Sequence, residues 1–526
     1  MWNSSFSERE EALDVISDLT IEDIESSESD MNIRFARNVI DNNIVNFREG
    51  EICIVYPRET ESDNVLNKQI LKGSVSKISR DYIDIRFRHK QRNQSYFDNN
   101  KTWAIEHDTL DTSYNSMYKS LFNFLRASMQ KRNILLGIDA PKQSSDYYDK
   151  LAYPENIINK AIAAEDYFLR VGPPGTGKTS IFAKRLVEEY HKRDNTNILI
   201  LAYTNRAVDE LCDAVNAAFG CEEETTDKFI RIGTELSCAE KYRGRLLQNI
   251  AEKAISRDSL RKELQDTRIF ISTIASINGR QELFNLKNFD VAIIDEASQI
   301  LEPQIIGLLP RFEKFIMIGD HNQLPAIVLQ KQFHSAISET ELTNIGITNC
   351  SDSLFERLLR NAITNNWSHV HSQLTIQGRM HNDIAAFPST YFYPDKLKPA
   401  KSWQSESWHS SFNGKDNLFS TIVASQRLAF FSTEKMAHTP ILSNKINENE
   451  ADVVVSIIKS LQEVYLHDNK SYNSDNIGII APYRNQIALI KHKLEQSNIK
   501  DHEDIMVDTV ERFQGSQRDI IIISFC

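Results

Sequence analysis

The sequence has few cysteines, and no two of them lie at the spacing of a metal-binding pair. Its six cysteines are scattered without any C-x-x-C pair: Cys53, Cys212, Cys221, Cys238, Cys350 and Cys526. This spacing argues against a zinc or iron–sulfur site and against a disulfide framework. Scattered, unpaired cysteines are typical of proteins in a reducing cytosol, so we expect a cytoplasmic protein.

Long apolar runs are also absent. No uncharged apolar stretch approaches the roughly 18 residues that a membrane-spanning helix needs. The first residues, MWNSSFSEREEALD, contain neither a basic region nor an apolar one. They therefore do not form a secretory signal. We expect no membrane partner.

Basic residues are too few to balance the acidic ones, and the formal net charge is −12. This excess argues at first against a nucleic-acid partner. However, residues 1–31 contain ten acidic residues and one arginine, so most of the negative charge lies there. The rest of the chain is close to neutral and can carry a basic groove. Net charge therefore does not decide between partners.

The chain of 526 residues is too long for one hydrophobic core. Residues 1–46 are predicted to form an acidic helical arm, or alternatively a solvated tail. Alternation of apolar residues at Ile83, Ile85 and Phe87 predicts a small β-barrel over residues 47–107. A basic stripe on the other face either follows a phosphate backbone or is simply solvated. Its residues are Arg86, Arg88, Lys90 and Arg92.

The remaining chain divides into a stalk and two larger domains. Apolar residues at helical spacing predict a helical stalk over residues 108–149. From residue 150 onward, short apolar strands alternate with helical patterns, which predicts a parallel α/β fold. We expect a first domain at 150–330, with a helical insertion at about 222–268, and a second domain at 331–526.

A phosphate-binding loop is the strongest motif. The stretch FLRVGPPGTGKTS places G-x-x-x-x-G-K-T after a predicted strand and at the start of a helix. Its glycines let backbone N–H groups surround phosphate oxygens, while Lys178 reaches the β and γ phosphates and Thr179 binds Mg²⁺. The predicted nucleotide-binding residues are Gly172, Pro173, Pro174, Gly175, Thr176, Gly177, Lys178, Thr179 and Ser180.

Two further apolar strands end in polar side chains. FDVAIIDEASQ ends in Asp295, predicted to hold Mg²⁺, and Glu296, predicted to polarise the attacking water. FIMIGDHNQLPA places Gln323 just past its tip, where an amide can sense the γ-phosphate. Because carboxyl ends of parallel strands meet at one edge, we expect all three side chains near the loop.

With LAYTNRAVDEL, IQGRMHNDIAAF, IGIIAPYRNQI and VDTVERFQGSQRDIIII, these motifs come in a familiar order. The chain resembles the superfamily 1 helicases, in the branch of the nonsense-mediated-decay helicase, senataxin and the nuclease–helicase of Okazaki-fragment processing. The resemblance covers about residues 150–526 motif by motif. The barrel and stalk resemble the accessory domain of that branch.

The resemblance implies two RecA-like domains with ATP between them and single-stranded DNA or RNA across both. It implies that Arg379 reaches the γ-phosphate from the second domain. It also implies a nucleic-acid track, made of Thr204, Asn205, Thr273, Pro482, Tyr483 and Thr509. We expect a monomer, with a nuclease or other domain in the full-length chain.

The chain departs from the family pattern at several positions, two of which lie in QGRMH and shortly after FQG. Gly378 stands in QGRMH where the family has an adenine-stacking tyrosine, and Gln517 replaces a glutamate at the nucleotide site. One more family motif, with an arginine for the γ-phosphate, would follow the IIIIS strand. We therefore expect the 526 residues to be a truncated portion of a longer protein. Because that motif is missing from them, we expect them to bind ATP and single strands but to hydrolyse ATP slowly.

Three functions remain open on these residues. The first is an ATP-dependent helicase or translocase, for which the resemblance implies 5′→3′ movement. The second is a nucleic-acid-stimulated ATPase that remodels protein–nucleic-acid complexes without unwinding. The third is a nucleic-acid-binding module whose ATPase has decayed. The sequence does not distinguish DNA from RNA, because one platform serves both.

Overall fold

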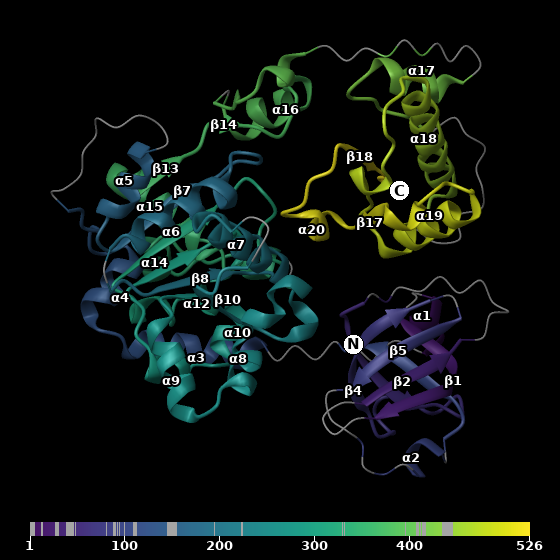
Figure 1. Ribbon diagram of the computed structural model, residues 1–526, viewed down its shortest axis with the longest axis horizontal. Helices are drawn as coiled ribbons and strands as arrows, with labels where there is room; N and C mark the ends of the chain where they lie inside the picture. Colours follow the sequence, from purple (N-terminus) through teal and green to yellow (C-terminus); the bar gives the residue numbers. More distant parts are fainter. Residues whose placement is uncertain are drawn as a thin grey trace. The chain divides into compact units, whose positions relative to one another are not determined.

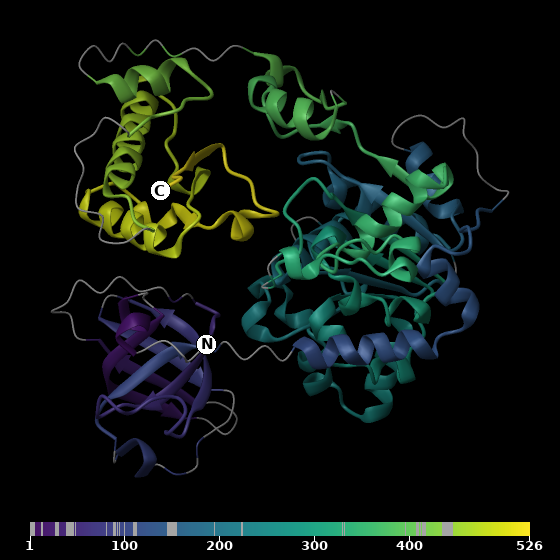
Figure 2. The ribbon, with the colours of Figure 1, turned by 180° about the vertical axis from the view of Figure 1, so that it is seen from behind.

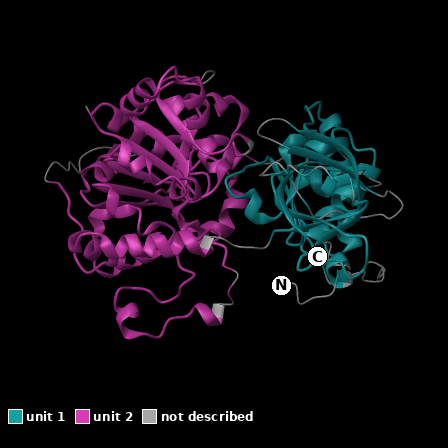
Figure 3. Cartoon of the chain, turned by 90° about the horizontal axis from the view of Figure 1, so that it is seen from below, with its two compact units in different colours: residues 1–111, 408–526 teal, residues 112–407 magenta. Residues whose placement is uncertain are grey.

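The computed structural model divides the chain into two compact units. Unit 1 comprises residues 1–111 and 408–526, and unit 2 comprises residues 112–407 (Figure 3). The structure describes residues 6–526 outside 12–13, 27–30, 38–46, 48, 80, 88–90, 92, 94, 99, 109–112, 145–154, 194, 222–224, 329, 331, 395, 407–409, 411, 413–416 and 434–444. Three basic-stripe residues lie outside the described residues: Arg88, Lys90 and Arg92.

The N-terminal part of unit 1 is a closed antiparallel barrel, ordered β1-β2-β5-β4-β3-β6 (Figure 1). Its strands are β1 (Val15–Ser26), β2 (Met31–Ala36), β3 (Ile52–Pro57), β4 (Leu71–Ile78), β5 (Tyr82–Phe87) and β6 (Trp103–His107). Ile83, Ile85 and Phe87 point into the barrel as their alternation predicts. Two short helices accompany it, α1 (Phe6–Glu11) and α2 (Ser95–Asp98).

The predicted acidic arm over residues 1–46 is wrong where the structure describes it. β1 and β2 form two of the six barrel strands, and β1 closes the barrel by pairing with β6. The pairing register of β1 shifts between Ile16 and Leu19 and again between Ile21 and Asp23. Each shift breaks the two-residue alternation, so apolar residues fall at spacings of three that imitate a helix.

Unit 2 is built on a seven-stranded sheet ordered β13-β7-β12-β11-β8-β10-β9, in which every paired neighbour is parallel. The strands are β7 (Tyr167–Val171), β8 (Ile198–Ala202), β9 (Phe229–Ile232), β10 (Ile269–Thr273), β11 (Val291–Ile294), β12 (Lys314–Gly319) and β13 (His371–Gln373). Apolar side chains on its two faces belong to two separate clusters of buried residues. This is the α/β arrangement that the alternating pattern predicts.

Helices cover both faces of this sheet (Figures 1 and 2). They include α5 (Glu155–Ala163), α6 (Lys184–His191), α7 (Asn205–Ala218), α10 (Ile274–Asn278), α12 (Glu302–Ile305) and α15 (Leu354–Thr364). The predicted helical insertion at about 222–268 contains α8 (Leu247–Lys253) and α9 (Arg257–Asp266), but it is not wholly helical, because it also contains β9 of the parallel sheet. None of the helices in the described ranges is both long and apolar enough to cross a bilayer.

The predicted stalk contains α3 (Ser113–Arg126) and α4 (Met129–Leu136). α3 lies so close to α12 that a Cβ added at Gly307 would stand 1.9 Å from the Ser120 carbonyl oxygen. The Ser120 hydroxyl also accepts a hydrogen bond from the Gly307 N–H at 3.0 Å. The stalk helix α3 therefore belongs to unit 2 and is anchored to the rest of it through backbone contact that only glycine permits.

The first α/β domain does not end at residue 330 as predicted. β13 pairs in parallel with β7, so the sheet recruits a strand from beyond that boundary. The following segment, with β14 (Ile376–Gln377), α16 (Asn382–Phe392) and β15 (Lys398–Pro399), also belongs to unit 2. No sequence pattern marks this boundary, because β13 has only three residues.

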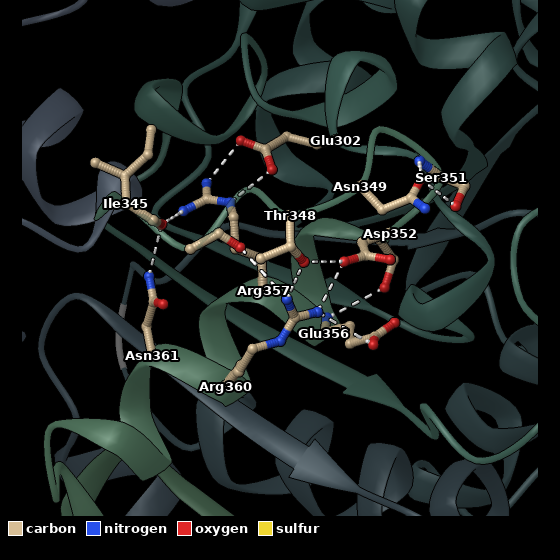
Figure 4. A network of polar contacts seen from close by, with 12 residues as sticks. Glu302, Ile345, Thr348, Asn349, Ser351, Asp352, Glu356, Arg357, Arg360 and Asn361 are labelled. Atoms are coloured by element: carbon tan, nitrogen blue, oxygen red, sulfur yellow. Dashed lines mark hydrogen bonds and ion pairs between the residues drawn. The ribbon is translucent and has the colours of Figure 1, made fainter. Parts of the chain in front are cut away.

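A buried arginine fixes α15 under the sheet (Figure 4). Arg357 donates to both carboxylate oxygens of Glu302 at 2.7 and 2.6 Å, and also to the Leu135 carbonyl oxygen at 2.9 Å. It therefore joins α12, α15 and the stalk helix α4. Removing one partner of such a buried pair is strongly destabilising, because the other charge stays buried.

The C-terminal part of unit 1 is a smaller parallel sheet ordered β17-β16-β18. Its strands are β16 (Ile477–Ile480), β17 (Met506–Asp508) and β18 (Ile520–Ile523). Helices α17 (Leu418–Ser425), α18 (Glu448–His467) and α19 (Arg484–Gln496) accompany this sheet, with α20 (Val510–Phe513) after β17. β18 is an edge strand that buries Ile522 and exposes Ile521 and Ile523.

Candidate nucleotide and nucleic-acid site

The phosphate loop connects β7 to a helix in unit 2. Gly175 and Gly177 both have φ of 74°, a left-handed conformation that glycine adopts without strain. The Gly172 N–H donates to the Gly319 carbonyl oxygen at 2.9 Å, which ties the loop to the end of β12. A π-helical stretch, η1 (Lys178–Ala183), then leads into α6. All nine residues predicted at 172–180 lie in this loop and the first turn after it.

Two acidic side chains meet the loop from the end of β11. Lys178 Nζ lies 2.8 Å from Glu296 Oε1, and both side chains are largely buried. Burial disfavours the charge on Lys178, but Glu296 and Asp295 outweigh it and raise the pKa of Lys178. Glu296 Oε2 is buried and makes no hydrogen bond to any described residue. That oxygen can therefore accept a proton from a bound water.

The second acidic side chain meets the loop hydroxyl. Asp295 Oδ2 accepts a hydrogen bond from Thr179 Oγ1 at 2.5 Å. Burial and the neighbouring Glu296 raise the pKa of Asp295 to about 6, against the opposing effects of Lys178 and Thr179. A buried carboxylate beside a hydroxyl supplies the oxygen ligands that Mg²⁺ prefers. The residues present therefore fit a magnesium ion at this point.

The predicted γ-phosphate sensor also lies at the loop. Gln323 Nε2 donates to Asp320 Oδ2 at 2.6 Å and to the Gly172 carbonyl oxygen at 3.5 Å. Asp320 directly follows β12 and is fully buried. A residue that the sequence motifs did not indicate, Tyr393, donates to the same Asp320 oxygen at 2.5 Å.

Arg379 lies with the phosphate loop in unit 2, whereas the predicted boundary assigned it to the second domain. The Gly378 N–H donates to the Gly175 carbonyl oxygen at 2.9 Å. A Cβ added at Gly175 would stand 2.4 Å from the Arg379 Cβ. Burial lowers the pKa of Arg379, while Glu210 and Glu296 oppose that shift. Arg379 therefore packs directly on the loop backbone.

Two buried glutamines shape the turn that carries Arg379. Gln377 Oε1 accepts from the backbone N–H groups of Arg379 and Met380 at 2.9 and 2.7 Å. Gln404, fully buried, donates to the carbonyl oxygens of Gln377 and Met380 at 3.1 and 2.7 Å. Gln404 lies outside every sequence motif, and the 27-residue separation from Gln377 hides the contact from local pattern analysis.

The predicted nucleic-acid residues of unit 2 lie at the carboxyl ends of two adjacent strands. β8 and β10 pair in parallel, with Ala202 opposite Thr273. Thr204 caps α7 by accepting from the Ala207 N–H at 3.2 Å, and Asn205 is the first residue of that helix. Thr273 caps α10 in the same way. Both threonines thus stabilise helix N-termini, and the strand order brings the three predicted residues to one edge of the sheet.

The remaining predicted residues belong to unit 1. Pro482 and Tyr483 follow β16, and both are exposed. Thr509 follows the adjacent strand β17 and precedes α20. Gln517 is an exposed residue between α20 and β18. Within unit 1 the first three again cluster at the carboxyl ends of neighbouring parallel strands.

Known proteins match this chain over most of its length. Two family models, each described as an AAA domain, match residues 350–526 and residues 152–262 with 237–331. The DNA replication ATP-dependent helicase/nuclease JHS1 of Arabidopsis thaliana is 28% identical over 487 residues, which cover 87% of this chain and 33% of that protein. The chain thus spans about a third of this relative's length.

Two other matching proteins are covered by this chain over a larger share of their own length. The uncharacterized ATP-dependent helicase MJ0104 of Methanocaldococcus jannaschii is 25% identical over 502 residues, covering 79% of this chain and 70% of that protein. The solved structure of Arterivirus nonstructural protein 10, a helicase, is 10% identical with a TM-score of 0.32, covering 74% of this chain and 63% of that one. The sequence matches carry the assignment.

The phosphate loop, the acidic strand end and the later motifs thus occur on two parallel-sheet domains preceded by a barrel and a helical stalk. Helicases match most of this chain. The chain belongs to the superfamily 1 helicases, in the branch of the nonsense-mediated-decay helicase, senataxin and the Okazaki-fragment nuclease–helicase.

Proposed function

We propose that this chain hydrolyses ATP and uses the energy to move along single-stranded nucleic acid and unwind duplex, in the 5′→3′ direction. The proposal rests on one observation, which is that the phosphate loop contacts the acidic end of β11. There Lys178 contacts Glu296, and Thr179 contacts Asp295. These are the groups that phosphoryl transfer from ATP requires, gathered on one loop.

Each group has a separate task. Lys178 exchanges its contact with Glu296 for the β and γ phosphates, which releases the carboxylate. Glu296 then orients a water and accepts its proton, and its Oε2 already lacks a hydrogen bond to the described residues. Gln323 and Arg379 approach the γ-phosphate from the end of β12 and from the turn packed on Gly175.

Thr179 and Asp295 would hold a magnesium ion. When bound, Mg²⁺ neutralises charge on the phosphate oxygens. The role of this chain is to supply the ligands and keep Asp295 ionised. Lys178 favours that ionised form by lowering the pKa of the carboxyl against the effect of burial.

The nucleic-acid partner is proposed to be a single strand gripped through its backbone. Short hydroxyl and amide side chains at strand ends can hold phosphates without reading sequence. The name of the relative JHS1 refers to DNA replication, which favours DNA as the strand. The monomeric state, the cytoplasmic location and a nuclease domain in the full-length chain stay predictions.

The test is ATP hydrolysis with and without single-stranded DNA and RNA of equal length, followed by strand displacement on a tailed duplex. The proposal predicts stimulated hydrolysis and displacement from a 5′ tail. Stimulation without displacement would favour the remodelling ATPase. Strand binding without any hydrolysis would favour a decayed motor.

A further inference from the structure

One buried carboxylate oxygen in unit 2 has two side-chain donors. Asp320 is fully buried, and its Oδ2 accepts from Gln323 Nε2 at 2.6 Å and from Tyr393 Oη at 2.5 Å. Among the described residues, its other oxygen, Oδ1, accepts only a backbone N–H, that of Asn322, at 3.2 Å. Gln323 and Tyr393 therefore both supply side-chain hydrogen bonds to the buried Asp320 carboxylate.

Tyr393 belongs to the segment that carries Arg379. α16 begins three residues after Arg379, and Tyr393 directly follows its last residue. A second contact binds the same elements, because Asn322 Nδ2 donates to the Phe392 carbonyl oxygen at 2.9 Å. The loop after β12 is thus attached to the end of α16 at two adjacent points.

The shared oxygen has a consequence for nucleotide binding. Gln323 donates its amide N–H groups to Asp320 and Gly172 in this structure. To reach a γ-phosphate it must leave Asp320. A buried carboxylate that loses a donor costs free energy, so the exchange is easy only if another donor remains.

We propose that Tyr393 is a positioning residue that holds Asp320 when Gln323 moves to the γ-phosphate. This rests on the proposed function, since it assumes that the site takes ATP. This role requires no direct contact between Tyr393 and the nucleotide. Tyr393 acts through Asp320, and it links γ-phosphate sensing to the helix that follows Arg379.

Without the Tyr393 hydroxyl, Gln323 becomes the only side-chain donor to Asp320 Oδ2 among the described residues. Its departure would strand a buried charge, so Gln323 should stay on Asp320. ADP has no γ-phosphate and does not require the exchange. The two nucleotides should therefore respond differently to the loss of one hydroxyl.

The experiment is nucleotide binding by the whole chain carrying Tyr393→Phe, measured by calorimetry with ADP and with a non-hydrolysable ATP analogue. We expect affinity for the analogue to fall about tenfold, which corresponds to about 1.4 kcal/mol. Affinity for ADP should stay within about twofold. The matched control is Tyr391→Phe, two residues earlier in α16, where the residue is 73% exposed and both affinities should stay unchanged.

A double-mutant cycle distinguishes positioning from a purely structural role. If Tyr393 acts through Gln323, then Tyr393→Phe should have no further effect on analogue binding in a Gln323→Ala background. Equal weakening of ADP and analogue, or additive effects in the cycle, would overturn the proposal. If the parent chain binds no ATP analogue, the proposed function itself fails. If the parent binds it and Tyr393→Phe binds it equally well, only the role of Tyr393 fails.

Discussion

At the scale of single residues, the site contains strained and buried charged groups that destabilise the folded chain. Only a function explains why such groups are gathered there. Glu296 is a non-glycine residue with φ of 50°, a left-handed conformation that costs free energy. Its side chain is also buried beside Asp295. The ion pair with Lys178 compensates for part of that burial. Strain and buried like charge at one strand end are typical of active sites rather than of structural strand ends.

Replacing Glu296 by Gln tests its proposed role. The amide keeps the shape of the side chain but cannot accept a proton from water. We expect ATP binding to survive while turnover falls by about 10²–10⁴-fold, the usual contribution of a general base. Nucleotide binding and single-turnover hydrolysis measure the two effects separately. Equal loss of both would instead make Glu296 a structural partner of Lys178.

Gly378 stands where the family pattern has an aromatic residue. A Cβ at this position meets nothing closer than the Ala400 Cβ at 3.8 Å, so the backbone there accepts a side-chain Cβ without a clash. Gly378→Tyr should tighten adenine-nucleotide binding by about 1–3 kcal/mol if the ring stacks on the base. Gly378→Ala controls for the change in backbone freedom. Unchanged affinity in the tyrosine variant would mean that the base is bound elsewhere.

At the scale of secondary structure elements, the barrel begins earlier than its sequence pattern indicates. β1 and β2 contribute Leu19, Ile33 and Phe35 to the barrel core, and all three are fully buried. The strand β1 also lies between β2 and β6 in the closed sheet. The acidic residues of this region are therefore compatible with a strand, because the outer face of a barrel is solvated.

Removing residues 1–36 tests whether they are an arm or part of the barrel. The shortened chain would lose two of six strands and expose the edges of β5 and β6. We expect it to aggregate or to unfold at a clearly lower temperature. The control is a chain that begins at Phe6 and keeps β1 and β2. Wild-type solubility and thermal unfolding in the chain from residue 37 would contradict the barrel assignment.

Local motifs allowed the phosphate loop and the acidic strand end to be predicted, since their residues lie within a few positions of each other. The parallel sheet also followed from alternation of apolar strands and helices. Tyr393 and Gln404 could not be predicted, because each acts through contacts 24 to 73 residues away along the chain. The strand β1 was hidden by its register shifts, which remove the period that identifies a strand.

At the scale of the whole molecule, the proposed chemistry and half of the proposed strand track lie in different units. The phosphate loop, the acidic strand end and Arg379 belong to residues 112–407, whereas Tyr483 and Thr509 belong to residues 408–526. A motor that couples hydrolysis to movement needs both units to respond to the same strand. Coupling is therefore testable through a residue that is remote in sequence from the catalytic groups.

Replacing Tyr483 by Ala should weaken stimulation without harming the basal reaction. Tyr483 is 38% exposed at the end of β16, where its ring can stack on a base. Base stacking on an aromatic ring contributes about 1–3 kcal/mol, so the concentration of single strand needed for half-maximal ATPase should rise about 5–150-fold. Basal ATPase should stay unchanged, because the hydrolytic groups lie in unit 2.

Phe430→Ala, at an exposed aromatic of unit 1 outside the proposed track, should leave both quantities unchanged. Loss of basal activity in Tyr483→Ala, or normal stimulation, would show that this residue does not hold the strand. Running the same titration with DNA and with RNA also identifies which of the two the track accepts, since the affected partner is the one that stacks on the ring.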